Sequence, residues 1–277
     1  MKFGRFDVTA PDFGPFRLDG GSMFGSVPKN LWASRIAPDA DNCIPLATRS
    51  LLIRADSTVI LVDVGCGDKW DEKYRKIYGI RNAPESALGF ERKEVTDIIL
   101  THLHFDHAGG ISRYKEGSKV IELVYPNATV HLQRDNWINA QTPNLKERAS
   151  YLPEHVQPLK DARLNLLQGD TELFPDIFVR QVNGHTRGQQ WIELRAGTEG
   201  IAFPTDLIPT SHHVPLAFHM GYDICAETLL REKETFLDKA AEHKMILIFQ
   251  HDLQVPAARI VKDEKCRYSP SPASISL

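Results

Sequence analysis

A run of acid–base side chains at residues 102–107 is the strongest chemical feature of this 277-residue sequence. It reads His-Leu-His-Phe-Asp-His and is followed at once by Ala-Gly-Gly. Imidazole nitrogens and carboxylate oxygens together suit zinc and neighbouring first-row metals. His102 and His104 are two positions apart, so in an extended segment they point the same way and can hold one ion. Asp106 and His107 come after the chain turns and are expected to face a second ion.

Three further residues of the same types lie downstream, and each follows an apolar segment. His185 stands in a glycine-flanked loop, Asp206 has two oxygens that could bridge two ions, and His251 could complete the second ion. Side chains at strand ends converge on one rim of a sheet, where open α/β folds place their chemistry. The glycine pair at 109–110 lets the backbone pass close beneath the site. The strands predicted to deliver these ligands are residues 95–100, 177–182, 200–204 and 245–249.

The remaining elements predict one α/β domain over residues 1–277, since folds of this class and length are routinely single. Residues 14–34, rich in glycine and aromatics, are expected to form a loop that lines the active site. The Ser/Pro-rich tail at 266–277 is expected to be poorly ordered. A hairpin is predicted at 50–54 and 58–64, further strands at 129–132 and 190–195, and helices at 69–78 and 225–243.

Composition excludes several classes of partner. The net charge of −3 and the lack of a basic run give no reason to expect nucleic acid. No stretch of the sequence approaches the roughly 18 apolar residues that cross a membrane. Four scattered cysteines without a Cys-x-x-Cys pair, and a beginning without the apolar core of a signal peptide, predict a reduced, cytoplasmic protein. A homodimer is left open.

The motifs, in their order along the chain, resemble those of the metallo-β-lactamase superfamily. The match runs from about Ser50 to Asp252 and includes His-x-His-x-Asp-His, Gly-His-Thr, an Asp and a final His. The resemblance implies an αβ/βα sandwich in which two mixed β-sheets are flanked by helices, with a site for two zinc ions. Other divalent first-row metals stay open. It places His102, His104 and His185 on the first ion and Asp106, His107 and His251 on the second, with Asp206 bridging.

Within the superfamily, the sequence favours the lactonases, arylesterases and phosphotriesterases. Asp206 stands where the secreted antibiotic-hydrolysing enzymes have cysteine, and His104 stands where the flavodiiron branch has glutamate. Only 26 residues follow His251, too few for the helical substrate domain of glyoxalase-II-like hydrolases. The cluster is similar to that of quorum-quenching N-acyl-homoserine lactonases. The segments 19–32 and 206–210 resemble the YtnP-like lactonase branch.

The function that this resemblance implies is hydrolysis of a lactone or ester by a hydroxide held between two metal ions. Asp106 or Asp206 would relay a proton to the leaving alkoxide. The alternative enzyme is an arylesterase or phosphotriesterase that uses the same ligands, because an uncharged ester presents a similar electrophile. The alternative outside enzymes is a metal-stabilised binding protein, which would hold metal without turnover.

One position departs from the better-known homoserine lactonases. They place a tyrosine three residues beyond the bridging aspartate, to hydrogen-bond the substrate carbonyl, and this chain has Pro209 there. A substitute donor is sought among His212, His213 and Tyr222. An apolar pocket for an acyl chain is predicted from Met23, Phe24, Trp32 and Phe218.

Overall fold

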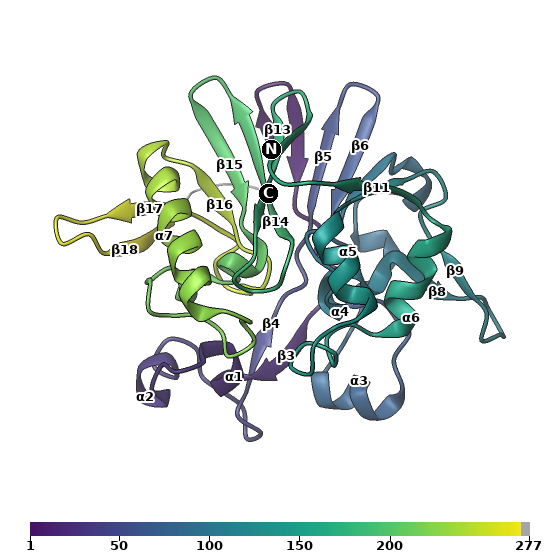
Figure 1. Ribbon diagram of the computed structural model, residues 1–277, viewed down its shortest axis with the longest axis horizontal. Coiled ribbons are helices and arrows are strands. Elements are labelled where there is room, and N and C mark those ends of the chain that lie inside the picture. Colours follow the sequence, from purple (N-terminus) through teal and green to yellow (C-terminus); the bar gives the residue numbers. More distant parts are fainter. Residues whose placement is uncertain (273–277) are drawn as a thin grey trace. The chain divides into compact units, whose positions relative to one another are not determined.

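The computed structural model describes residues 1–272, and these residues form two compact units. The first unit contains Met1–Phe16 and Thr48–Gly169. The second contains Arg17–Ala47 and, of the described residues, 170–272. Each unit is built on a seven-stranded mixed sheet with helices. Figure 1 shows where the elements that it labels lie. A compact unit is not by itself an independent domain, so the single domain predicted over 1–277 stays a prediction.

The sheet of the first unit has the order β1-β2-β5-β6-β7-β10-β11. The strands from β6 to β11 pair in parallel, and the strands from β1 to β6 pair antiparallel. The seven strands are β1 Lys2–Phe3, β2 Phe6–Thr9, β5 Leu51–Ala55, β6 Thr58–Val62, β7 Asp97–Ile99, β10 Thr129–Gln133 and β11 Arg163–Leu167. The α-helices are α3 Glu72–Tyr78, α4 Phe105–Ala108, α5 Arg134–Gln141 and α6 Pro153–Val156. Shorter elements are β8 Ser112–Tyr114, β9 Ile121–Leu123 and the 3-10 turns η1 Glu85–Ala87, η2 Arg92–Glu94, η3 Gly109–Ile111 and η4 Gln157–Asp161.

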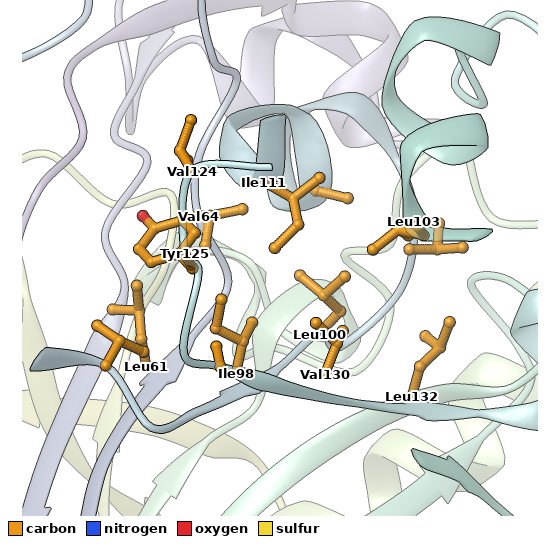
Figure 2. Close-up of a cluster of buried hydrophobic side chains, with 14 of the residues drawn as sticks. Leu61, Val64, Ile98, Leu100, Leu103, Ile111, Val124, Tyr125, Val130 and Leu132 are labelled. Atoms are coloured by element: carbon orange, nitrogen blue, oxygen red, sulfur yellow. The ribbon is translucent and has the colours of Figure 1, made fainter. Parts of the chain in front are cut away.

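A buried apolar cluster on this sheet fixes the register of β7, the strand before the histidine run. Ile98 of β7 lies opposite Leu61 on one side and Val130 on the other, and all three are at most 2% exposed. Figure 2 shows these side chains with Leu100 and Leu103 in the same cluster. A slip of one residue would turn these apolar side chains to the opposite face. The cluster therefore sets where the chain leaves β7 and begins the run of ligands.

The sheet of the second unit has the order β12-β13-β14-β15-β16-β17-β18, and its β15–β16 pair is parallel. The long helix α7 buries Leu229, Phe236, Leu237 and Ala240, which recur at helical spacing. The strands are β12 Thr171–Phe174, β13 Ile177–Val182, β14 Gln189–Ala196, β15 Glu199–Phe203, β16 Ile246–Ile248, β17 Ala257–Lys262 and β18 Tyr268–Pro272. The remaining elements are the pair β3 Phe16–Asp19 and β4 Cys43–Leu46, the helices α1 Gly20–Phe24, α2 Lys29–Trp32 and α7 Ala226–Glu242, and the 3-10 turns η5 Thr205–Leu207 and η6 Ser211–His213.

The strands predicted to precede the candidate ligands are confirmed as β7, β13, β15 and β16. The helix predicted at 225–243 is confirmed with bounds one residue shorter at each end. The helix predicted at 69–78 begins later, at Glu72, because the Asp71 side chain accepts a hydrogen bond from the Tyr74 backbone N–H at 2.8 Å and caps the helix there.

Two predictions about the ends of the chain are corrected. Residues 14–34 are not a loop: they contain β3, α1 and α2, and Asp19 caps α1 by accepting from the Ser22 N–H at 2.7 Å. The tail is ordered through Pro272, since β18 pairs antiparallel with β17 from Lys262 to Ala258. The rest of the predicted tail, 273–277, lies outside the described residues.

The carboxylate of Glu193, on β14, pairs with three cationic side chains of the second unit. Its carboxylate is 3.0 Å from Arg180 Nε, 2.9 Å from Arg195 Nε and 2.7 Å from Lys239 Nζ, and the residue is 2% exposed. Burial raises the pKa of Glu193, but hydrogen bonds and charge from these cations outweigh it and hold the pKa below its ordinary value of 4.5. The carboxylate therefore stabilises the fold only while it is ionised.

We expect Glu193→Gln to lower the free energy of unfolding by about 1–3 kcal/mol at neutral pH. A lowered folded-state pKa means that the carboxylate contributes above the unfolded value of 4.5 and loses its contribution as the pH falls through the folded-state pKa. Urea unfolding from neutral to acid pH measures this. The variant should lose less stability on acidification than the wild type, and equal acid sensitivity would contradict the ion-pair assignment.

Candidate metal centre

The first unit brings four predicted ligands together in two pairs. After β7 the chain leads to His104, the N-cap residue of α4, whose backbone is extended at φ −63° and ψ 155°. His102 Nε2 lies 3.0 Å from His104 Nδ1, as expected for two donors that share one ion. One turn on, Asp106 Oδ2 lies 3.7 Å from His107 Nε2. All four side chains are buried. The two short distances agree with the prediction that His102 and His104 point the same way and that Asp106 and His107 lie together after the turn.

Asp63, at the end of β6, fixes the orientation of His107. Its carboxylate accepts from the Thr101 N–H at 2.8 Å, from Thr101 Oγ1 at 2.7 Å and from His107 Nδ1 at 2.8 Å, and it is fully buried. Because Nδ1 is bound to this carboxylate, Nε2 is the ring nitrogen that faces Asp106. Sequence reasoning missed this role. A usable signal was an aspartate that ends a buried β-branched strand.

His104 faces a second buried acid. Glu147 Oε1 lies 3.8 Å from His104 Nε2, and the Tyr151 ring meets the imidazole edge-on with centroids 4.8 Å apart. Glu147 Oε2 also accepts from the Asn144 and Asn139 side-chain amides at 2.6 and 3.2 Å. The imidazole therefore turns Nε2 toward a carboxylate and Nδ1 toward His102.

The glycine pair after the run allows the predicted close approach of the backbone. A Cβ atom at Gly109 would lie 2.1 Å from the Cys66 carbonyl oxygen, and one at Gly110 would lie 2.1 Å from the Val64 carbonyl oxygen. The buried Lys69 Nζ donates to the Gly109 carbonyl at 2.6 Å. A side chain at either glycine would push the ligand loop away from the segment that follows β6.

The second unit places Asp206 between two histidines. Asp206 Oδ2 lies 3.1 Å from His185 Nε2, and Asp206 Oδ1 lies 3.1 Å from His251 Nε2. Each carboxylate oxygen thus faces a different imidazole, and all three residues are buried. A carboxylate that is shared by two ions needs each of its oxygens to face the donors of a different ion, and within the second unit Asp206 has this arrangement.

The far nitrogen of each of these imidazoles is bound to the protein. His185 Nδ1 lies 2.9 Å from Asp223 Oδ1, and His251 Nδ1 lies 2.8 Å from the Ala47 carbonyl oxygen. Burial lowers the pKa of His185, but the carboxylates of Asp206 and Asp223 outweigh it and raise that pKa to about 10. Both rings are therefore oriented with Nε2 toward Asp206.

The backbone just before Asp206 is strained. Thr205 has φ +52°, a conformation that β-branched residues rarely adopt. The Gln189 side-chain amide lies 2.7 Å from Thr205 Oγ1, and with its oxygen turned toward them it also accepts from the Asp206 and Leu207 N–H groups at 3.1 Å. Strained backbone that is held in place by its surroundings is common at functional sites.

The donor set fits divalent first-row metals. Imidazole nitrogens and carboxylate oxygens, without sulfur, suit zinc and also manganese, iron or cobalt. Buried carboxylates or a backbone carbonyl bind the outer nitrogens of several of the histidines, as is usual for histidines that ligate metal. The side chains that could hold an ion are His102, His104, Asp106 and His107 in the first unit, and His185, Asp206 and His251 in the second.

Comparison with known proteins identifies the family. Residues 43–251 match the family model described as the metallo-beta-lactamase superfamily. The chain belongs to this superfamily. The predicted membership and fold class are confirmed: the chain has the metallo-beta-lactamase fold, of the α/β class with mixed sheets and helices.

Curated relatives of this metallo-beta-lactamase chain include bacterial lactonases. It is 27% identical over 172 residues to the N-acyl homoserine lactonase of Bacillus cereus, and this match covers 60% of each of the two chains. It is 24% identical over 188 residues to N-acyl homoserine lactonase AiiA of Bacillus thuringiensis subsp. kurstaki, covering 66% of this chain and 63% of the relative. The chain thus spans about 60% of the length of the curated relatives that it matches.

Solved structures of similar fold match over the whole chain. A probable metal-dependent hydrolase from Staphylococcus aureus has a TM-score of 0.89 at 25% identity, with all of both chains covered. AidC, a dizinc quorum-quenching lactonase solved with its product N-hexanoyl-L-homoserine, has a TM-score of 0.80 at 19% identity, covering 100% of this chain and 97% of AidC. Among residues 1–272, no helix combines the length and the apolar character that crossing a membrane requires.

The residues predicted to bind an acyl chain form a packed aromatic cluster in the second unit. The Phe24 ring is stacked on Trp32 at 5.4 Å and on His213 at 4.6 Å, and Phe218 meets it edge-on at 6.1 Å. Met23, Phe24 and Trp32 are at most 1% exposed, so the structure gives them a packing role. Phe218 is half-buried, and a contact with substrate remains a prediction for this set.

The three candidate donors differ in their surroundings. His213 Nε2 donates to the Met23 carbonyl at 2.8 Å, and Nδ1 accepts from Thr210 Oγ1 at 2.7 Å. Burial lowers the pKa of His213 to about 3. Both ring nitrogens of His213 are thus bound within the second unit. His212 is half-buried, and burial lowers its pKa while Asp252 acts in the opposite sense. Tyr222 is also half-buried. A hydrogen bond from any of the three residues to substrate stays a prediction.

Proposed function

We propose that this chain is a dinuclear metal-dependent hydrolase that opens lactone or ester bonds, most closely of the quorum-quenching lactonase type. The observation that carries the proposal is Asp206, whose two oxygens each face the Nε2 atom of a different buried histidine. The paired donors of the 102–107 run, and membership of the superfamily, support it.

In this proposal the first ion is held by His102, His104 and His185 and the second by Asp106, His107 and His251. Asp206 is shared between them. Zinc is the proposed metal, because imidazole and carboxylate donors suit it. When bound, the ions supply Lewis acidity that brings the pKa of water toward neutrality and polarises a carbonyl oxygen.

The chain's own residues orient the donors and handle the proton. Asp63, Asp223 and the Ala47 carbonyl keep the Nδ1 atoms of their histidines occupied, so that Nε2 stays available. Asp106 and Asp206 are the carboxylates proposed to carry a proton to the leaving alkoxide, which is a poor leaving group without it. Both carboxylates are buried.

Lactones are the proposed substrate class because the lactonase relatives and neighbours point to them. The runner-up is an arylesterase or phosphotriesterase with the same ligands. Pro209 stands where the better-known homoserine lactonases have tyrosine, which weakens the choice of lactones over esters. The metal-stabilised binding protein is the alternative without turnover. A role in quorum quenching, a cytoplasmic location, and the absence of nucleic-acid and membrane partners belong to the same proposal.

The decisive experiment is elemental analysis of the purified protein together with a panel of lactones, aryl esters and phosphotriesters. Two equivalents of metal with chelator-sensitive lactone opening would support the lactonase. Two equivalents with preferential ester or triester turnover would move the function to the runner-up. Metal without any turnover would favour the binding protein, and failure to bind metal even on reconstitution would refute the centre.

We expect kcat/KM to rise with acyl-chain length by up to about fourfold per methylene, which corresponds to about 0.8 kcal/mol of apolar burial. This series tests whether the half-buried Phe218 contacts the acyl chain of the substrate. Phe218→Ala should flatten the series, while Val261→Ala, which shortens a side chain 49% exposed on β17, should leave it unchanged. A flat series in the wild type would count against the assignment.

A further inference from the structure

We propose that Asp223 is the positioning residue of His185: it sets the direction and the basicity of the imidazole in the metal centre. The inference rests on the proposed function, because it concerns the affinity of that centre for metal. The local sequence does not mark Asp223 as part of the site, since it lies 38 positions from His185 and outside the motifs that contain the predicted ligands.

The geometry separates the two carboxylates around the His185 ring. Asp206 Oδ2 is 3.1 Å from Nε2, and Asp223 Oδ1 is 2.9 Å from Nδ1. The two ring nitrogens point away from each other, so a group bound at Nδ1 cannot share an ion bound at Nε2. Asp206 is therefore on the ligand side, and Asp223 acts through the imidazole.

Asp223 is itself held in place. Its side chain is fully buried, and Oδ2 accepts from the Met220 N–H at 2.7 Å. His219 Nδ1 lies 3.4 Å from the same oxygen. With Oδ2 bound in this way, the carboxylate cannot rotate without losing the Met220 bond, and Oδ1 stays directed at His185.

The backbone around Asp223 holds the same loop. The Ile224 N–H donates to the His185 carbonyl at 3.1 Å, and the Cys225 N–H donates to the Gly184 carbonyl at 2.9 Å. From α7, Glu232 accepts from the N–H groups of Asn183 and Gly184 at 2.8 and 2.9 Å. Both the carbonyl and the amide groups of the loop at residues 183–185 are therefore hydrogen-bonded. Removal of the Asp223 carboxylate should change the orientation of the His185 ring more than the position of the loop.

The expected consequence is a selective loss of metal affinity. A carboxylate on the outer nitrogen fixes the Nδ1–H tautomer and makes Nε2 a stronger donor, and the loss of such partners typically costs about 10–100-fold in metal affinity. A purely structural acid would lower stability without this selective loss. The two roles can be distinguished by measuring both quantities.

The test compares Asp223→Asn with Asp97→Asn in the full-length protein. Asp97 is a matched control, because it too is an aspartate whose carboxylate contacts a histidine: its Oδ1 lies 2.8 Å from His131 Nε2 in the first unit. Neither Asp97 nor His131 is a predicted ligand. Zn²⁺ affinity is measured by competition with a chromophoric chelator, the Co²⁺ form is compared by visible absorption, and the thermal midpoint is measured without metal.

We expect Asp223→Asn to bind Zn²⁺ about 10–100-fold more weakly and to alter the Co²⁺ spectrum, while Asp97→Asn changes neither. Asp223→Glu, which keeps a carboxylate, should recover part of the affinity, and it serves if the amide variant does not fold. Wild-type affinity in Asp223→Asn, or an equal loss in Asp97→Asn, would overturn the positioning role and leave the dinuclear proposal standing. If the wild type bound no metal at all, both would be overturned.

Discussion

Asp206→Asn is expected to lower kcat/KM by at least about 10³-fold, which corresponds to about 4 kcal/mol of transition-state stabilisation. The reason lies in the two oxygens of the carboxylate, one 3.1 Å from His185 Nε2 and the other 3.1 Å from His251 Nε2. An amide has one acceptor oxygen and carries no negative charge, so it can serve one side of the pair and not both. The variant should also retain fewer than two equivalents of metal.

Steady-state kinetics with the best substrate of the panel, and elemental analysis of the same sample, check this result. Glu193→Gln is the control, because it also removes a buried carboxylate from the second unit but touches none of the predicted ligands. Its turnover should stay near that of the wild type at neutral pH. Two equivalents of metal and normal turnover in Asp206→Asn would refute the bridging assignment.

Asp63→Ala is expected to lower the free energy of unfolding by about 3–5 kcal/mol. The carboxylate is fully buried and accepts three hydrogen bonds, two from Thr101 and one from His107. Alanine would leave those donors buried in the apolar interior, where unmet hydrogen bonds are costly. Denaturant unfolding of the metal-free protein gives the value directly.

Asp63→Asn separates the effect on the fold from the effect on the centre. An amide of the same shape can still accept from the Thr101 N–H, but its NH₂ group favours the His107 tautomer that carries the proton on Nε2. That tautomer has no lone pair at Nε2 for a metal. We expect this variant to keep more stability than Asp63→Ala and still lose the second ion. Full metal content in Asp63→Asn would contradict the orienting role.

Sequence reasoning identified the candidate ligands because their signals are local. The run at 102–107 has the spacing of donors on an extended segment followed by a turn, and each other ligand follows a short apolar strand. The residues behind the ligands were missed because their partners are distant in sequence. Asp63 is 44 positions from His107, and Asp223 is 38 from His185. No spacing rule connects such pairs, which only the tertiary packing brings together.

The segment at 14–34 escaped prediction for a different reason. Its helices α1 and α2 have five and four residues, too few to show helical periodicity. One local signal was available, since Asp19 stands three positions before Ser22 and caps α1. The aromatic residues there are predicted to line a pocket, and that contact with substrate stays a prediction. In the structure the Phe24 ring stacks on the rings of both Trp32 and His213.

Strand β18 bears on how this chain meets other copies of itself. Among residues 1–272 it is the last strand of its sheet, and it contains Pro270 and Pro272, two positions apart. Proline has no N–H to donate, and within sheets it is confined to edges where that side faces outward. The outer edge of β18 therefore offers a poor template for another strand, which guards against edge-to-edge aggregation. Self-association through a continuous intermolecular sheet is disfavoured at this edge, so a dimer would have to use a different surface.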